Sequence, residues 1–255
     1  KASLEMSNAA GDTDTGLTNT LTDYATSTFT PATAGDYLLI YTAESMGQWA
    51  YRTFIQARLN TTVLDEGQLG SRADVNYDSF ASFCVVNLPA SSQTIALSAY
   101  KEGVGWQNIR RCRVAAIRLS GGRFADYSSS ADDTQSGTTS TTFVQKLSKT
   151  WTSGGTGTWL LLASARVNGT GGQAAEVQTQ YNDSTTLALP RRVFHASDEW
   201  KNENSVAVQP IAAGGRQHDI DYRSGSASYT VKIKYAHLVM LPLDTAGGPA
   251  DLVIT

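Results

Sequence analysis

This sequence of 255 residues has little of what marks several common classes of protein. Charged residues make up only 17% of it, and the formal net charge is −3. It contains no basic block that could follow a phosphate backbone. No apolar run approaches the roughly 20 residues that a membrane-spanning helix needs. We therefore expect no nucleic-acid partner and no membrane span.

Motifs of the common enzymes are also missing. The three histidines, His195, His218 and His237, lie far apart in the sequence, which excludes a metal pair on one helix turn. Neither a Gly-x-Ser-x-Gly nucleophile elbow nor a phosphate-binding loop occurs. His237 stands among apolar residues and is interpreted as a core or interface histidine. The sequence predicts a protein that is not an enzyme, with no catalytic residue and no cofactor.

Cysteine is scarce, with only Cys84 and Cys112, and each lies in a strand-like run. There is no Cys-x-x-Cys pair, which argues against a zinc or redox site. Two interpretations stay open. The residues are buried thiols that act as small apolar side chains, or they form a disulfide, which spacing alone does not define.

What is present favours β-structure. Hydrophobic residues make up 41% of the chain, and Ser, Thr, Gly, Asn and Gln fill most polar positions. This composition is typical of short strands joined by many turns. In the first half we expect strands over residues 35–44, 51–59, 77–87, 93–100 and 108–119. Regular short strands of this kind predict a sandwich or a barrel.

The sequence repeats itself at an offset of about 122 residues. The pattern of Phe29, Gly35 and an apolar run returns at Trp151 and Gly157 (29 to 151, 35 to 157). Three further matches follow in the same order: residues 58–62 with 180–184, 96–99 with 219–222, and 111–115 with 232–236. A duplicated β-module explains this constant sequence offset.

Composition then sets the expected boundaries. Residues 128–133 are small and polar, as in a linker, and residues 245–249 interrupt the pattern near the end. We expect an N-terminal arm over 1–17, a first domain over 18–120, a linker over 121–139, a second domain over 140–243 and a C-terminal tail or strand over 244–255.

Residues 29–41 carry a family resemblance. Phe29, a short loop, Gly35 and a Tyr37-led apolar strand resemble the early strands of the C1q and tumour-necrosis-factor jelly roll. The strand ending in an Asn turn at residues 54–60 and the closing strand at 113–117 are similar to that family too. The resemblance covers both copies. An aromatic-Gly pair that usually closes the family's last strand is absent here.

The resemblance implies an all-β fold of two tandem jelly-roll β-sandwich domains related by internal duplication. It also implies homotrimers and a role in binding or assembly. Tandem jelly rolls of small polar composition resemble capsid decoration, head-fibre and tail proteins of bacteriophages and other viruses. We expect a structural protein of the virion surface or the extracellular space, partnered by itself and by other virion or surface proteins. The alternative is a secreted or tail-borne carbohydrate-binding module for adhesion, lectin-like or C1q-like, with glycans as partners.

Aromatic residues in polar loops are the candidate ligand or interface residues. Such side chains either fold back onto the ends of a sandwich, or form a sugar-stacking platform or a subunit interface. Neighbouring arginines could supply ion pairs. The candidates are Trp49, Tyr51, Trp106, Trp200, Arg191 and Arg192.

One short segment resembles the opening of a calcium loop. Asp74, Asn76 and Asp78 offer side-chain oxygens at alternate positions. Ser79 stands where such a loop has Gly, and no Glu closes it. A bound calcium ion and a polar strand edge both remain interpretations of this segment.

Overall fold

The computed structural model describes residues 6–11, 14–47, 52–70, 77–120, 124, 126–169, 174–182, 185–194 and 200–245. Within these ranges the regular elements are all β-strands, which confirms the expected all-β class. No helix in the described part of the chain could cross a membrane. The chain divides into two compact units, one built mainly from residues 3–118 and the other mainly from residues 119–198 and 203–255.

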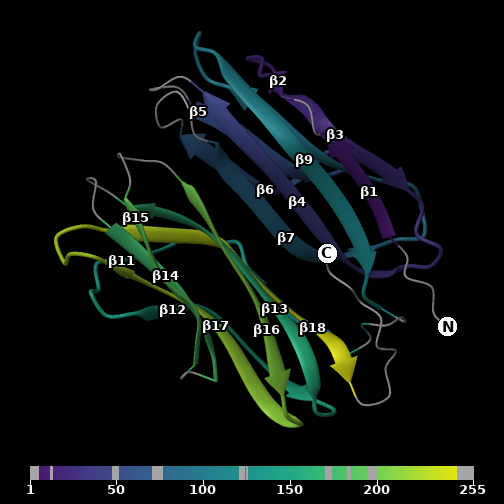
Figure 1. The fold of residues 1–255 in the computed structure, drawn as a ribbon, viewed down its shortest axis with the longest axis vertical. Helices are drawn as coiled ribbons and strands as arrows, with labels where there is room; N and C mark the ends of the chain where they lie inside the picture. Colours follow the sequence, from purple (N-terminus) through teal and green to yellow (C-terminus); the bar gives the residue numbers. More distant parts are fainter. Residues whose placement is uncertain are drawn as a thin grey trace. The chain divides into compact units, whose positions relative to one another are not determined.

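The N-terminal unit contains two antiparallel sheets (Figure 1). One has the strand order β1-β9-β4-β7, with β2 also paired to β9, and the other has the order β3-β8-β5-β6. The strands are β1 (Met6–Gly11), β2 (Thr15–Gly16), β3 (Thr22–Phe29), β4 (Gly35–Gly47), β5 (Arg52–Leu59), β6 (Thr62–Gly70), β7 (Asp78–Leu88), β8 (Gln93–Lys101) and β9 (Gln107–Arg118).

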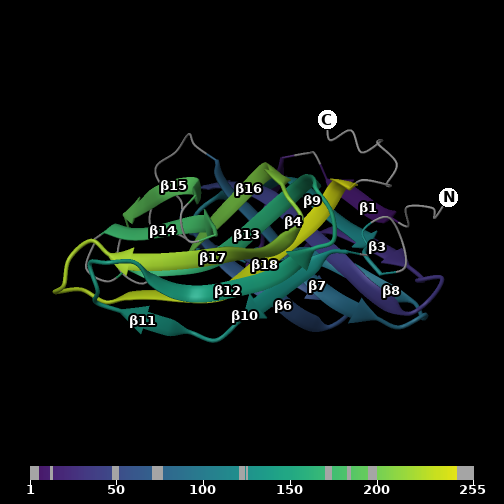
Figure 2. The ribbon, with the colours of Figure 1, turned by 90° about the horizontal axis from the view of Figure 1, so that it is seen from below.

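The C-terminal unit also has two sheets. One follows the order β10-β18-β13-β16, with β11 also paired to β18, and the other follows β12-β17-β14-β15. Figure 2 shows β12 running alongside β17. The strands are β10 (Ser128–Asp132), β11 (Ser136–Thr138), β12 (Val144–Ser153), β13 (Gly157–Gly169), β14 (Ala174–Tyr181), β15 (Thr185–Phe194), β16 (Lys201–Ile211), β17 (Gly214–Ser224) and β18 (Val231–Thr245).

The two units share one topology. In each, the last strand pairs with the first, and the chain passes back and forth between the two sheets, as in a jelly roll. The correspondence runs β1 to β10, β4 to β13, β7 to β16 and β9 to β18. A duplication requires this shared order, and common ancestry of the units stays a prediction.

Two unusual backbone conformations recur in both units. Asn60 and Asn182, each at φ 53°, form the turns after β5 and β14, where asparagine tolerates the left-handed region. A bulge places Arg111 of β9 at φ 49° and Tyr235 of β18 at φ 48°. The bulge corrects the sequence alignment, because residue 111 corresponds to 235 and not to 232. The extra residues lie in the connections before β15 and β18, each of which is one residue longer than its counterpart before β6 or β9.

Each unit closes around its own apolar interior. In the first, Tyr37, Leu39 and Tyr41 of β4 pack with Ile55 and Leu97 from the opposite sheet. In the second, an equivalent cluster forms between its two sheets, from Trp159, Leu161, Val177, Ile220 and Met240. Such burial of alternate side chains explains why the apolar period predicted these strands.

The expected arm, linker and tail need correction. Residues 6–11 of the arm form β1, which pairs with β9 from Met6 opposite Ile117 to Gly11 opposite Cys112. The linker range contains β10 and β11, both paired to β18. Strand β18 itself continues to Thr245, beyond the expected boundary at 243. Strands β1, β10 and β11 are held by backbone hydrogen bonds to their partner strands. Their small polar side chains therefore give no pattern from which a strand could be predicted.

A buried lysine fixes the turn between β10 and β11. The ammonium of Lys146 donates to Asp132 Oδ2 at 2.6 Å, to the carbonyl of Thr134 at 2.8 Å and to Ser136 Oγ at 3.1 Å. Burial raises the pKa of Asp132, but the hydrogen bonds from Lys146 and Thr134 outweigh it and leave that pKa below its ordinary value. The predicted linker is therefore part of the domain.

Candidate functional site

Several predicted site residues lie outside the described residues: Trp49, Tyr51, Asp74 and Asn76. Asp78 is described, and it begins β7 with a half-buried side chain. Within the described ranges, no group of three or more His, Cys, Asp or Glu side chains is placed to hold a metal ion. The calcium site stays a prediction that these ranges do not reach.

Trp106 lies at an exposed apolar loop tip of the N-terminal unit, between β8 and β9. The tip comprises Val104, which is 90% exposed, and Trp106, which is 45% exposed. Its backbone is tied down on both sides. Asn19 Nδ2 donates to the carbonyl of Gly103 at 2.8 Å, and Lys101 Nζ donates to the carbonyl of Gly105 at 2.7 Å. An apolar tip held this way presents its side chains at little cost in entropy.

The remaining candidates, Trp200, Arg191 and Arg192, lie in or next to the strands of the C-terminal unit. Trp200 directly precedes β16 and is half-buried. Arg191 and Arg192 belong to β15, opposite Val177 and Glu176 in the register of the sheet. The side chains of both arginines lie outside the described part of the structure.

Both cysteines are buried, and neither is part of a disulfide. Cys84 lies on β7 and Cys112 on β9, and both belong to the apolar interior of the N-terminal unit. Burial raises the pKa of the Cys112 thiol to about 12. The thiol interpretation is confirmed, and the disulfide is not formed.

Charged side chains on β4 and β9 are paired with one another. Glu44 accepts from Arg110 Nε at 2.8 Å and from Arg111 at 2.9 Å. Burial raises the pKa of Glu44, but hydrogen bonding and attraction to the two guanidinium groups bring it below its ordinary value. The Arg110 guanidinium also lies 3.4 Å from the centre of the Tyr77 ring. This cluster is a structural network, because its charges face each other.

Strand β16 is an edge strand with an apolar outer side. Its inward positions, such as Glu203 and Ser205, are buried, whereas Val206 is 68% exposed and Val208 is 54% exposed. Pro210 lies on the same outward side and lacks a backbone donor, as tolerated at sheet edges. Exposed valines along a sheet edge are a feature of surfaces that bind another chain.

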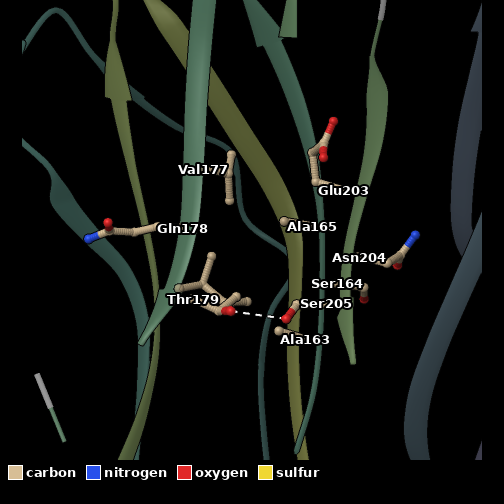
Figure 3. A pocket seen from close by; sticks show the side chains of 10 residues that line it. Ala163, Ser164, Ala165, Val177, Gln178, Thr179, Glu203, Asn204 and Ser205 are labelled. Carbon is tan, nitrogen blue, oxygen red and sulfur yellow. Dashed lines mark hydrogen bonds between the residues drawn. The ribbon is translucent and has the colours of Figure 1, made fainter. Parts of the chain in front are cut away.

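Sequence reasoning missed a cavity of about 120 Å³ between the sheets of the C-terminal unit. Side chains from β13, β14, β16 and β17 line it. Figure 3 shows Thr179 and Ser205 pointing toward one another, joined by a hydrogen bond of 3.1 Å, while Gln178 and Asn204 point away. A signal for it exists in the repeat, since Ala163 stands where the first copy has Tyr41 (41 to 163).

No protein-family model matches this sequence, and no curated protein matches it. Among solved structures, the chain is similar to the Eiger TNF of S. frugiperda, with a TM-score of 0.34 and 9% identity over 47% of this chain and 94% of that one. It is also similar to the VP2 subviral particle of infectious bursal disease virus, with a TM-score of 0.32 and 10% identity over 95% and 73%.

A third similarity is to a protein of Sulfolobus Turreted Icosahedral Virus, with a TM-score of 0.29 and 11% identity over 90% of this chain and 60% of that one. All three TM-scores are below 0.5. The jelly-roll topology stated above therefore rests on the strand pairing of the chain itself.

Proposed function

We propose that this chain is a non-enzymatic structural protein of a virion surface, such as a bacteriophage capsid-decoration, head-fibre or tail protein, and that it assembles as a homotrimer. The observation that carries the proposal is the exposed apolar side of edge strand β16. Val206 and Val208 offer aliphatic surface there on a rigid strand. Virion placement and the number three come from the resemblance of the repeated module to jelly rolls of that kind.

Aliphatic surface on a sheet edge favours assembly over sugar binding. Burying one valine side chain contributes about 1.5–3 kcal/mol, and closed symmetry multiplies that contribution over identical interfaces. Sugars, in contrast, are held by flat aromatic rings with polar groups around them. An interface between copies makes better use of Val206 and Val208 than a glycan does.

Mass in solution tests the assembly. We expect the wild-type chain to sediment as a trimer and the double variant Val206→Asp/Val208→Asp to sediment as a monomer, because each carboxylate would have to be desolvated in the interface. Ala227→Asp, at an exposed turn position before β18, is the matched control and should remain trimeric. A monomeric wild type, or a trimeric double variant, contradicts the proposal. Antibody labelling of intact particles in the electron microscope tests the virion location, and unlabelled particles would argue against it.

A second candidate function is carbohydrate-binding adhesion, favoured by the exposed Trp106 indole on its fixed loop. A glycan array distinguishes the two. In this alternative, Trp106→Ala loses the array signal and Trp106→Tyr retains it, because tyrosine still offers a ring for stacking. The Val206→Asp/Val208→Asp variant should bind as the wild type does, since β16 takes no part. An array without any signal for the wild type removes this candidate.

A further inference from the structure

The cavity of the C-terminal unit has an apolar wall and a polar end. Ala163 and Ala165 of β13 and Val177 of β14 supply the hydrocarbon surface. Thr179 of β14 and Ser205 of β16 supply two hydroxyl groups from opposite sheets, joined by the hydrogen bond drawn in Figure 3. A mostly apolar space with a few directed polar groups is the common form of a small-molecule site.

The N-terminal unit shows what fills the corresponding space. Tyr41 of β4 and Ala163 of β13 occupy equivalent positions. Each lies two residues before an alanine that stands opposite a bulge, Ala43 at the bulge of β9 and Ala165 at the bulge of β18. Tyr41 is fully buried, and its hydroxyl donates to the carbonyl of Arg58 at 3.0 Å. The phenol ring thus spans from β4 to β5. Ala163 has only a methyl group, so the same span is left unfilled.

The hydroxyl pair lies near the end of that span. By the 122-residue offset, Ala57 corresponds to Thr179 (57 to 179), directly beside Arg58, whose carbonyl receives the Tyr41 hydroxyl. The Thr179 hydroxyl donates a hydrogen bond to Ser205 Oγ. The Ser205 hydroxyl can therefore donate its own hydrogen bond to a further acceptor oxygen. The second copy therefore offers a hydroxyl partner close to the place where the first copy satisfies a phenol.

We propose that this cavity binds a small phenolic molecule. The ring takes the place that the Tyr41 ring holds in the N-terminal unit, and the phenolic oxygen accepts a hydrogen bond from Ser205. The space of about 120 Å³ approaches that of a dry cavity of about 150 Å³ that takes up benzene in another protein, and its open side leaves room for the substituents of the ring. A space of this kind left unfilled costs packing energy, so a ring that enters it gains contacts with the surrounding strands.

The test uses p-cresol, which is the side chain of tyrosine as a free molecule, and toluene as the analogue without a hydroxyl. Titrating p-cresol into the full chain should give saturable NMR shifts of the Val177 methyl groups, with toluene binding several-fold more weakly. Ala163→Tyr should abolish p-cresol binding by placing a ring there permanently. Ala227→Tyr, the same change at an exposed position, should bind as the wild type does.

Ser205→Ala keeps the test decisive if Ala163→Tyr does not fold. This change removes the hydroxyl that donates to the phenolic oxygen, and we expect p-cresol to bind about tenfold more weakly while toluene binding is unchanged. The proposal is overturned if the wild type gives no saturable shift. It is also overturned if folded Ala163→Tyr still binds p-cresol, or if Ser205→Ala binds p-cresol and toluene in the wild-type ratio.

Discussion

His218 is a buried histidine in an apolar setting. It lies on the inward side of β17 and is 1% exposed, and neither ring nitrogen finds a hydrogen-bond partner among the residues that the structure describes. Burial lowers its pKa from 6.5 to about 4. Ile95 occupies the corresponding place in the N-terminal unit, since Ser27 pairs with Ile95 as Lys149 pairs with His218. The ring is a weak point of the second core.

The depressed pKa predicts acid sensitivity of the C-terminal unit. The unfolded chain takes up a proton below pH 6.5, whereas the folded unit resists protonation down to about pH 4. Above pH 6.5 His218 therefore does not reduce the free energy of unfolding. As the pH falls from 6.5 toward 4, this free energy decreases by about 3 kcal/mol. Urea unfolding at pH 7 and pH 4 should show a smaller loss for His218→Ile than for the wild type. Equal losses would rule out this role of His218.

At the scale of elements, β1 shows how a short edge strand completes a sheet. It pairs with β9 along its length, and a Cβ atom at Gly11 would lie 2.8 Å from the carbonyl oxygen of Tyr24. The backbone of β1 therefore passes close to β3. Only glycine allows this approach, because the obstacle is backbone and not a flexible side chain.

Deleting residues 1–11 should destabilise the N-terminal unit by a few kcal/mol, because each lost backbone hydrogen bond contributes about 1 kcal/mol and β9 becomes an open edge. A lower urea midpoint for this unit is the expected measurement. Gly11→Val should reproduce part of the loss. Deletion of residues 246–255, beyond β18, is the control for chain length. A chain shortened at residue 11 with the wild-type midpoint would show that β1 adds nothing.

At the scale of the whole molecule, one topology carries two different interiors. The N-terminal unit fills its sandwich with Tyr41 and Ile95, whereas the C-terminal unit has Ala163 and His218 at those places. The same strand order is compatible with both, because sheet pairing depends on the backbone and the apolar period. The first interior is filled by its own side chains, and the second leaves room for a ligand and for a titrating group.

Much of this fold could be predicted from the sequence. Long central strands such as β4 and β9 alternate apolar and polar residues, and the offset between Phe29 and Trp151 predicts two modules. The edge strands β1 and β10 were not predicted, because their small polar side chains bury little surface. Pairing with a partner strand defines them, and no local pattern records that partner.

The candidate sites divide in the same way. A tryptophan in a polar loop left two interpretations open, a ring folded back onto the sandwich or an exposed one, and Trp106 is 45% exposed. The cavity could not be predicted from any one segment, because it reflects a difference between the two units. Only a comparison of Tyr41 with Ala163 in the aligned repeat would have indicated it. The valines of β16 resemble those of any strand until the sheet order makes that strand an edge.

The place of β9 and β18 has a consequence for synthesis on the ribosome. Each is the last strand of its unit, yet each lies between two earlier strands, β1 and β4 or β10 and β13. The N-terminal jelly roll can thus close once Arg118 has emerged, while the second must wait with β13 unpaired on one side until Val231–Thr245 arrives. Nascent chains of intermediate length therefore carry one finished domain followed by an incomplete sheet with an open edge, the state in which a chaperone has most to protect.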